Sequence, residues 1–530
     1  MRSVPLRLPL LRSSRTRLRP LATIFTVIGA FLLICPPGAE LAAQGGPIPV
    51  TSDPIPFPRE DAELVDWLRE QRAAIGDVRK VKSPDLEGVF RHVDSGVLGG
   101  EFHLTEFPTS PNRADVIALL TRLLYLNVDR HVAILDFTNK TEWGASLSQG
   151  ELQMIRAEYQ DRIVALIDEA LALSPTGSVL AGLLETRGEL QVRGRQPREA
   201  AKSFRAAIAA DPVGPTLDEL YIKLSEAHIN AVEYPAAEKV CMEALARFPT
   251  SKLWPHYFWF LHKVLRQQGK VDEALSAWEQ VLPRLRAGAE GKPMVAAGGF
   301  VVPEQYRVDY RRYADRALFY KGFFLYAKGE VDAAQKAFQE YSDGLHEFIQ
   351  AGGTIAMDTK TYLDFQADPM EHRMSLLQGR PLPEFGADMS WLVPPSEVTR
   401  RKKGKLRMFC NAQRATGRQR GTFDLLKRLG EEYSSRGVQV EWVALSLHAG
   451  APLDRERAAV FKVLEEQQLY EWTIGVDVTG SGAHQQHAIN TGGVTLVCSD
   501  AEGNFAWQLV DPMHWDEGLI RSVVERLFPE

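Results

Sequence analysis

Residues 199–212 read EAAKSFRAAIAADP, and residues 236–249 repeat the pattern 37 positions later as AAEKVCMEALARFP. Two further copies follow, GKVDEALSAWEQVL at 269–282 and GFFLYAKGEVDAAQKAFQEY at 322–341. In each copy alanines recur at helical spacing, and an aromatic residue or a cysteine follows one turn later. Small residues let two helices approach closely, and the larger side chain fills the space between them. These copies in phase predict a stack of helix hairpins in the middle of the chain.

This pattern resembles the tetratricopeptide repeat (TPR) family over residues 181–348, with a break near 287–314. The resemblance implies an all-α solenoid whose stacked helices create a concave surface for a protein or peptide partner. Helical phase alone leaves open which polar and aromatic side chains face that surface. The candidates for a binding groove are Tyr221, Lys223, His228, Asn230, Tyr257 and Trp259.

The last third of the chain alternates strand and helix patterns. A strand at 405–412 (KLRMFCNA) precedes a helix at 423–437, and a strand at 438–447 (VQVEWVALSL) precedes a helix at 457–469. This alternation predicts an α/β domain. The chain then closes with a short helix at 483–490, two strands at 493–500 and 504–510, and a final helix at 517–528.

From Pro381 to the end, this order resembles the thioredoxin fold of the TlpA-like and peroxiredoxin (AhpC/TSA) groups, including their entry sequence PLPEF at 381–385. Redox members of these groups carry their cysteines at the start of the first helix, where the helix dipole lowers a thiol pKa. Here Thr416 and Gln419 hold those places, and Val494 holds the place of the family's cis-proline. The resemblance therefore implies a thioredoxin-like domain without the C-x-x-C motif or its redox chemistry.

An enzymatic alternative depends on Cys410, which lies near the end of the first strand of this domain. Arg414, Arg418 and Arg420 are close enough in sequence to lower the pKa of its thiol. A peroxidase or oxidoreductase role also requires that solvent reach its Sγ. Cys498 lies on the strand expected beside it, which leaves a cross-strand disulfide as a further possibility.

The N-terminus has the pattern of an export signal. Six arginines precede an apolar run at 21–35, which is shorter than the roughly 20 residues of a membrane-spanning helix. We expect residues 1–43 to be a signal peptide or, alternatively, an inner-membrane anchor, followed by a Pro/Gly linker at 44–60. The chain is then expected in the bacterial periplasm or cell envelope, and it meets a membrane only through that segment.

Composition and spacing exclude several classes. A formal net charge of −6 gives no electrostatic case for nucleic acid. The four cysteines lie too far apart in sequence for a disulfide framework or a zinc module. His484 and His487 share one face of a predicted helix without evident partner ligands, so we expect surface histidines and no metal site. No cofactor is implied.

The sequence therefore predicts a multidomain protein, an all-α TPR-like solenoid followed by an α/β thioredoxin-like domain. Its expected segments are a mainly helical region at 61–180, repeats at 181–348, a connector at 349–380 and the thioredoxin-like domain at 381–530. The predicted function is that of an exported, non-catalytic adaptor with an unknown protein or peptide partner. The alternatives are a thiol-dependent oxidoreductase or peroxidase that uses Cys410, and an envelope protein whose repeats assemble it with itself.

Overall fold

The computed structural model divides into two compact units, Met1–Val232 and Glu233–Glu530, and each is described by itself. The predicted N-terminal signal and most of the predicted connector lie outside the residues that the structure describes. The described residues are 55–75, 86–126, 128, 147–294, 298–350, 379–382, 389–397, 402, 404–410, 412, 415, 420–445, 452–477, 495–510 and 517–529.

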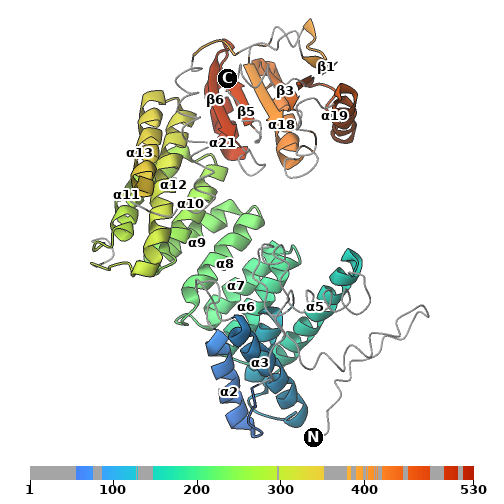
Figure 1. Cartoon of the computed structure of the whole chain (residues 1–530), viewed down its shortest axis with the longest axis vertical. Coiled ribbons are helices and arrows are strands. Elements are labelled where there is room, and N and C mark those ends of the chain that lie inside the picture. The colour runs from blue at the N-terminus through green and yellow to red at the C-terminus, as the bar shows by residue number, and fades with distance from the viewer. Residues whose placement is uncertain are drawn as a thin grey trace, which may run out of the picture. The chain divides into compact units, whose positions relative to one another are not determined.

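The described part of the first unit is built from helices that pack largely in sequence order (Figure 1). These are α2 (Asp61–Ile75), α3 (Leu86–Glu106), an unlabelled helix over 113–126, α5 (Gln149–Ala172), α6 (Gly177–Arg193), α7 (Pro197–Ala210) and α8 (Leu217–Asn230). Contacts join α2 with α3, α5 with α6, α6 with α7, and α7 with α8. The helices of each of these pairs thus bury their facing sides against each other.

Local sequence explains how these helices begin and pair. The Ser148 side chain accepts a hydrogen bond from the backbone N–H of Glu151, and the Glu151 carboxylate accepts one from the backbone N–H of Ser148. This reciprocal capping box starts α5. Pro197 lies in the first turn of α7, where a missing N–H costs nothing. A Cβ added to Gly188 of α6 would come within 2.5 Å of the Phe204 ring, so α6 and α7 approach closely at this glycine.

The second unit begins with another stack of helices, green to yellow in Figure 1. These are α9 (Tyr234–Arg247), α10 (Trp254–Gln267), α11 (Val271–Ala289), α12 (Glu304–Lys328) and α13 (Val331–Gln350). Contacts join each helix with the next one along the chain. Both units therefore contain TPR-like helical repeats, and the predicted helical-repeat fold is confirmed.

The residues that define the sequence repeat are core residues, as predicted. Like Phe204, both Trp278 and Phe338 are at most 1% exposed. Sixteen residues before Phe338, Gly322 leaves room for the aromatic ring, since an added Cβ would lie 2.9 Å from it. The equivalent place before Trp278 holds His262, whose Nδ1 accepts a hydrogen bond from Trp278 Nε1 at 2.7 Å. In this repeat a hydrogen-bonded histidine and tryptophan therefore occupy the places that a glycine and a phenylalanine occupy in the other two.

Within the described residues, the second unit ends in a six-stranded mixed sheet with the order β1-β4-β3-β2-β5-β6. β2 pairs in parallel with β3 and β3 with β4, whereas the β1–β4, β2–β5 and β5–β6 pairs are antiparallel. The strands are β1 (Ser390–Val393), β2 (Gly404–Cys410), β3 (Val438–Leu445), β4 (Thr473–Asp477), β5 (Thr495–Ser499) and β6 (Phe505–Val510). The helices between and after them are α18 (Arg420–Glu432), the one-turn η6 (Ser434–Arg436), α19 (Leu453–Gln467) and α21 (Glu517–Leu527).

The predicted order of elements in this α/β domain is confirmed for β2, α18, β3, α19, β5, β6 and α21. The sequence pattern does not predict β1 or β4. Both are short, and β4 contains a glycine at Gly475, which weakens the strand signal. The predicted helix at 483–490 lies outside the described residues.

The sheet and the helical stack of the second unit share one continuous hydrophobic core. Helix α21 packs against α10 and α12. A Cβ added to Gly518, near the start of α21, would lie 2.1 Å from the Gln267 carbonyl oxygen and 2.4 Å from the Gly269 nitrogen. Near the other end of α21, Arg526 Nε donates to the Ala327 carbonyl oxygen at 2.8 Å. Helix α21 is thus held to the end of α10 by a close backbone approach and to the end of α12 by a hydrogen bond from a side chain.

Candidate functional site

Cys410, on which an enzymatic role depends, ends β2 with a residue exposure of 0%. β2 lies between β3 and β5, and Cys410 itself pairs with Ala444 of β3. Trp442 Nε1 donates a hydrogen bond to the Cys410 carbonyl oxygen at 3.1 Å, which places an indole ring over this strand end. A peroxidatic or attacking thiol must reach solvent. The burial of Cys410 removes that access in this conformation.

Cys498 is enclosed as well, and it lies too far from Cys410 for a disulfide. Cys498 pairs with Leu406, four residues before Cys410, an offset of about 13 Å along the strand. Disulfide-bonded residues need Cα atoms about 4.4–6.8 Å apart. Neither cysteine forms a disulfide, so the possible cross-strand bridge between them is absent from this structure. Burial raises the pKa of the Cys498 thiol to about 12, although the Arg526 guanidinium opposes that rise.

The predicted redox-motif positions Thr416, Gln419 and Val494 lie outside the described residues, as does the histidine pair of the segment 483–490. Two of the three arginines close to Cys410 in sequence lie outside them too. The third, Arg420, begins α18 and is exposed. The loss of the redox motif therefore stays a prediction from the sequence.

Two of the groove candidates lie on α10 in the second unit. Tyr257 is 0% exposed and packs with its ring 6.2 Å from that of Phe248. Trp259 is half-buried, and the Arg316 guanidinium lies 5.2 Å from its ring centroid. Tyr257 is thus a core residue, and its burial keeps it from meeting a partner in this conformation. Trp259 keeps part of its surface accessible.

The other four candidates lie on α8 in the first unit. Tyr221 and His228 are buried, and His228 Nε2 lies 3.3 Å from a guanidinium nitrogen of Arg205. Asn230 ends α8 and is exposed. Lys223 is partly buried and reaches across to α6. A groove formed by all six candidates stays a prediction, and Lys223 is the one that the structure places in a charged site.

That site joins helices of the first unit through two carboxylates. Lys223 of α8 pairs with both Glu185 and Glu189 of α6. From the helix over 113–126, Arg122 pairs with Glu189, and a second guanidinium nitrogen lies 3.9 Å from Glu185. Glu185 and Glu189 are one turn apart on α6, so their side chains lie on the same side of the helix. The carboxylates therefore link α6 to α8 and to the helix over 113–126.

Two further arginines complete this charged site. The Arg193 guanidinium carbon lies 4.0 Å from the Tyr125 ring centroid, and that of Arg122 lies 5.6 Å from the same centroid, as in cation–π contacts. Arg72 of α2 is exposed and lies within electrostatic reach of Arg122 and Glu185. We name these cations and carboxylates the α6 cluster: Arg72, Arg122, Arg193, Lys223, Glu185 and Glu189.

The directions of the pKa shifts differ between the centre of the α6 cluster and its edge. Desolvation tends to raise the pKa of Glu189, but Arg122 and Lys223 outweigh it, and the pKa is lowered. Desolvation also works against the charge of Arg122, but Glu189 and Glu185 outweigh it and raise the pKa of the guanidinium. At the edge, desolvation and repulsion from Arg122 lower the pKa of Arg72. Burial and the Glu189 charge raise the pKa of Tyr125 to about 12.

The sequence pattern identifies Lys223 but not its partners. One signal could have indicated them, because Glu185 and Glu189 recur at i, i+4 among the apolar residues of α6. Carboxylates on the buried side of a helix are rare unless they are paired. Such a pair predicts cations on neighbouring helices, although it does not say which cations.

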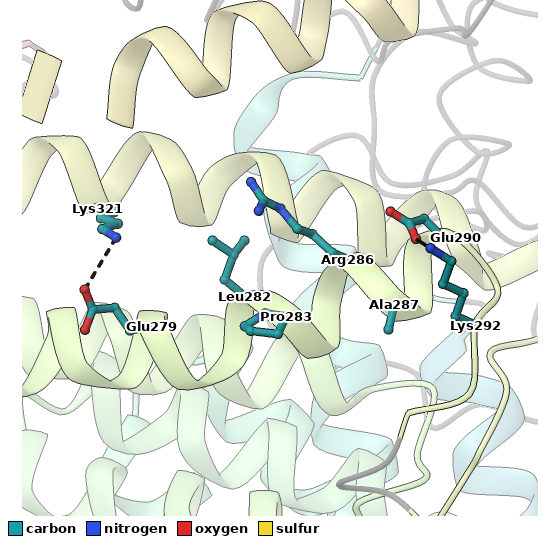
Figure 2. A pocket seen from close by; sticks show the side chains of 8 residues that line it. All are labelled: Glu279, Leu282, Pro283, Arg286, Ala287, Glu290, Lys292 and Lys321. Carbon is teal, nitrogen blue, oxygen red and sulfur yellow. Dashed lines mark ion pairs between the residues drawn. The ribbon is translucent and has the colours of Figure 1, made fainter. Parts of the chain in front are cut away.

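A pocket of about 550 Å³ lies along α11 in the second unit (Figure 2). Its lining charges are already paired, Lys321 with Glu279 at 3.4 Å and Lys292 with Glu290 at 2.6 Å. The fifth charged residue of the lining, Arg286, lies 3.8 Å from Glu340, so each charge of the pocket has a partner. The remaining lining residues are Leu282, Pro283 and Ala287.

Two further features of the described residues concern the kind of site that they can form. No group of three or more His, Cys, Asp or Glu side chains in these residues is arranged to hold a metal ion. No helix among them combines the length and the apolar character that crossing a membrane requires.

No protein-family model and no curated protein matches this chain. Among solved structures it is similar to the apo form of RapI (8% identity, 77% of this chain and 99% of that chain, TM-score 0.37). It is also similar to MamA (17% identity, 38% and 98%, TM-score 0.27) and to a Chlorobium tepidum protein assigned as the thiol:disulfide interchange protein DsbE (18% identity, 28% and 97%, TM-score 0.22). At these TM-scores the likenesses carry no argument about function. The fold itself defines a TPR-like helical-repeat protein with a C-terminal mixed sheet.

Proposed function

We propose that this chain is an exported, non-catalytic adaptor that binds a protein or peptide partner through its TPR-like repeats. Stacked helix hairpins present extended surfaces to partners, and both units contain such hairpins. On this proposal the C-terminal sheet is a degenerate thioredoxin-like domain that supplies a second surface and no thiol chemistry. Export rests on the predicted signal at 1–43, and the proposed location is the periplasm or cell envelope.

The observation that carries the proposal is the enclosure of Cys410 at 0% exposure in a sheet that shares its core with the repeats. A thiol enzyme must bring a thiolate to its substrate. Here Cys410 is covered, and Cys498 lies in the same core with a raised pKa. Binding through the repeats requires neither thiol.

Thiol titration of the full chain tests this proposal. Cys35→Ser removes the cysteine of the predicted signal, so that only Cys241, Cys410 and Cys498 are measured. We expect slow labelling of all three in the native protein, fast labelling after denaturation, and no turnover of peroxide or of a disulfide substrate. Fast labelling at mildly acidic pH that Cys410→Ser abolishes, and Cys241→Ser does not, would establish a reactive Cys410 and refute the non-catalytic proposal.

A further inference from the structure

Arg284 of α11 carries a positive charge that no carboxylate of the described residues balances. Its guanidinium carbon lies 3.5 Å from the ring centroid of Trp254, the first residue of α10. Its Nη2 donates a hydrogen bond to the Pro249 carbonyl oxygen. Among the residues that the structure describes, Arg284 makes no other hydrogen bond and no ion pair. By contrast, Arg286 on the same helix lies 3.8 Å from a carboxylate oxygen of Glu340.

Three hydrogen-bond donors around this guanidinium are enclosed without an acceptor. They are the Nε–H of Arg284 itself, the Nε1–H of Trp254 and the O–H of Tyr310 on α12, and Trp254 and Tyr310 are 4% and 0% exposed. A Cβ added to Gly288 would lie 2.2 Å from Cδ1 of Tyr310, so the tyrosine ring lies against α11 one turn after Arg284. Desolvation lowers the pKa of Arg284, and only Tyr310 opposes that shift. Negative charge beside Arg284 would therefore lower the free energy of this region.

We infer that Arg284 binds a carboxylate of an acidic segment of the partner protein. This inference rests on the proposed adaptor function and names the chemistry of its partner. Guanidinium and indole N–H groups only donate hydrogen bonds, so the ligand must supply acceptors. A carboxylate supplies two acceptors in one plane, which matches the guanidinium fork, and its charge balances that of Arg284. Arg284 is partly exposed, and Trp254 and Pro249 already hold its guanidinium in place, so little conformational entropy is lost on binding.

The surroundings of Arg284 favour a peptide over a nucleic acid. The chain carries a net charge of −6, which repels a ligand with a phosphate at every step. A peptide can place one carboxylate at Arg284 and neutral residues beyond it. The pocket along α11 offers no competing charge, because each of its charged residues has a partner. The residues of α11 one turn away from Arg284 are uncharged: Gln280, Val281, Ala287 and Gly288.

Protection from phenylglyoxal, a reagent that modifies guanidinium groups, tests the inference in the full chain. The probe is a hexapeptide of alternating glycine and glutamate with blocked termini, and the matched peptide carries glutamine in place of glutamate. Peptide mapping follows Arg284 and, as the internal control, Arg286, whose side chain is 51% exposed. At about ten times its Kd, the glutamate peptide should slow the modification of Arg284 about tenfold, as mass action requires. It should slow that of Arg286 by no more than about twofold, and the glutamine peptide should protect neither.

Equal protection of the two arginines, or no protection of Arg284, would overturn the inference. Inorganic phosphate or a hexathymidine oligonucleotide that protects Arg284 as well as the glutamate peptide does would overturn the choice of a carboxylate. These measurements need no variant, so they decide even if a substitution at Arg284 prevents folding.

A conservative variant tests the guanidinium fork separately. Arg284→Lys keeps the charge but loses the fork, so it should weaken binding of the labelled glutamate peptide about threefold or more in fluorescence anisotropy. Arg286→Lys should change the affinity by no more than about twofold, and thermal melts followed by circular dichroism check that both variants are folded. Unchanged affinity of a folded Arg284→Lys would refute the paired hydrogen bonds. Peroxide turnover on the same samples would refute the adaptor function itself, whereas missing protection without turnover refutes only the role of Arg284.

Discussion

Replacing Gly518 by alanine tests whether α21 holds the C-terminal sheet to the repeats of the second unit. The new Cβ would lie 2.1 Å from the Gln267 carbonyl oxygen and 2.4 Å from the Gly269 nitrogen, whereas ordinary contacts begin near 3.4 Å. Both neighbours are backbone atoms, so α21 must withdraw by about 1 Å. Such overpacking costs about 1–3 kcal/mol, and the higher helix propensity of alanine offsets at most about 1 kcal/mol. We expect docking to weaken by roughly 1–2 kcal/mol.

Cys498 is the natural reporter of this docking. Its thiol is 0% exposed and lies close enough to Tyr326 of α12 and Arg526 of α21 to interact with both electrostatically. Separation of the sheet from α12 would uncover it, so its labelling rate measures how often the unit opens. A loss of 1–2 kcal/mol should raise that rate about 5- to 30-fold. The assay is labelling with a thiol reagent in a Cys35→Ser background, with peptide mapping to identify the modified cysteine.

Gly182→Ala is the matched control for this variant. No atom lies within 4 Å of a Cβ added to Gly182, so the change should stabilise α6 by about 0.5–1 kcal/mol and leave Cys498 labelling unchanged. If Gly518→Ala labels Cys498 at the wild-type rate and keeps the wild-type melting temperature, α21 does not hold the sheet in the way that its backbone contacts imply.

Gly188→Ala would place a Cβ 2.5 Å from the Phe204 ring, so it should lower the free energy of unfolding of the first unit by about 1–3 kcal/mol in urea melts. Gly182→Ala on the same helix should raise that free energy. Equal effects of the two variants would contradict this packing. Desolvation and the nearby Arg266 hold the pKa of His262 well below 6.5, so the unfolded chain binds a proton that the folded chain does not. Stability should therefore fall as the pH drops below about 6.5, by at most about 1.4 kcal/mol per pH unit from this group. His262→Gln should flatten that slope in urea melts, and an unchanged slope would show that His262 is not its source.

The sequence predicts the repeats well because burial recurs with the spacing of the helix hairpin. Phe204 and Phe338 are buried at equivalent positions, and a glycine on the preceding helix makes room for each ring. His262 could not be read in this way. A histidine in a helix suggests a polar surface, and only the neighbouring helix supplies Trp278, whose indole N–H pairs with its Nδ1. The spacing of the repeat therefore predicts where two helices touch, but it does not predict which two side chains meet there.

The candidate site was less predictable for a related reason. Lys223 could be selected as a charged residue on a repeat helix, but its partners lie 34 and 38 residues away on α6. Helical phase says which side of one helix a residue occupies, and it does not say which residue of another helix comes opposite. Tyr257 shows the converse error. An aromatic residue in a repeat helix can line a binding groove or belong to the core. The burial of Tyr257 shows that it belongs to the core.

The C-terminal sheet, which encloses Cys410 and Cys498, also covers the end of the helical stack. The last hairpin of a helical stack leaves an apolar face that must be covered. In the second unit, Phe323 and Tyr326 of α12 are at most 3% exposed, and Phe323 packs with its ring centroid 5.9 Å from that of Trp507 on β6. The sheet thus covers α12 with residues of β6 and α21. That role depends on Trp507 and Gly518 and on no thiol, so the C-terminal sheet can cover the end of the helical stack without any redox chemistry.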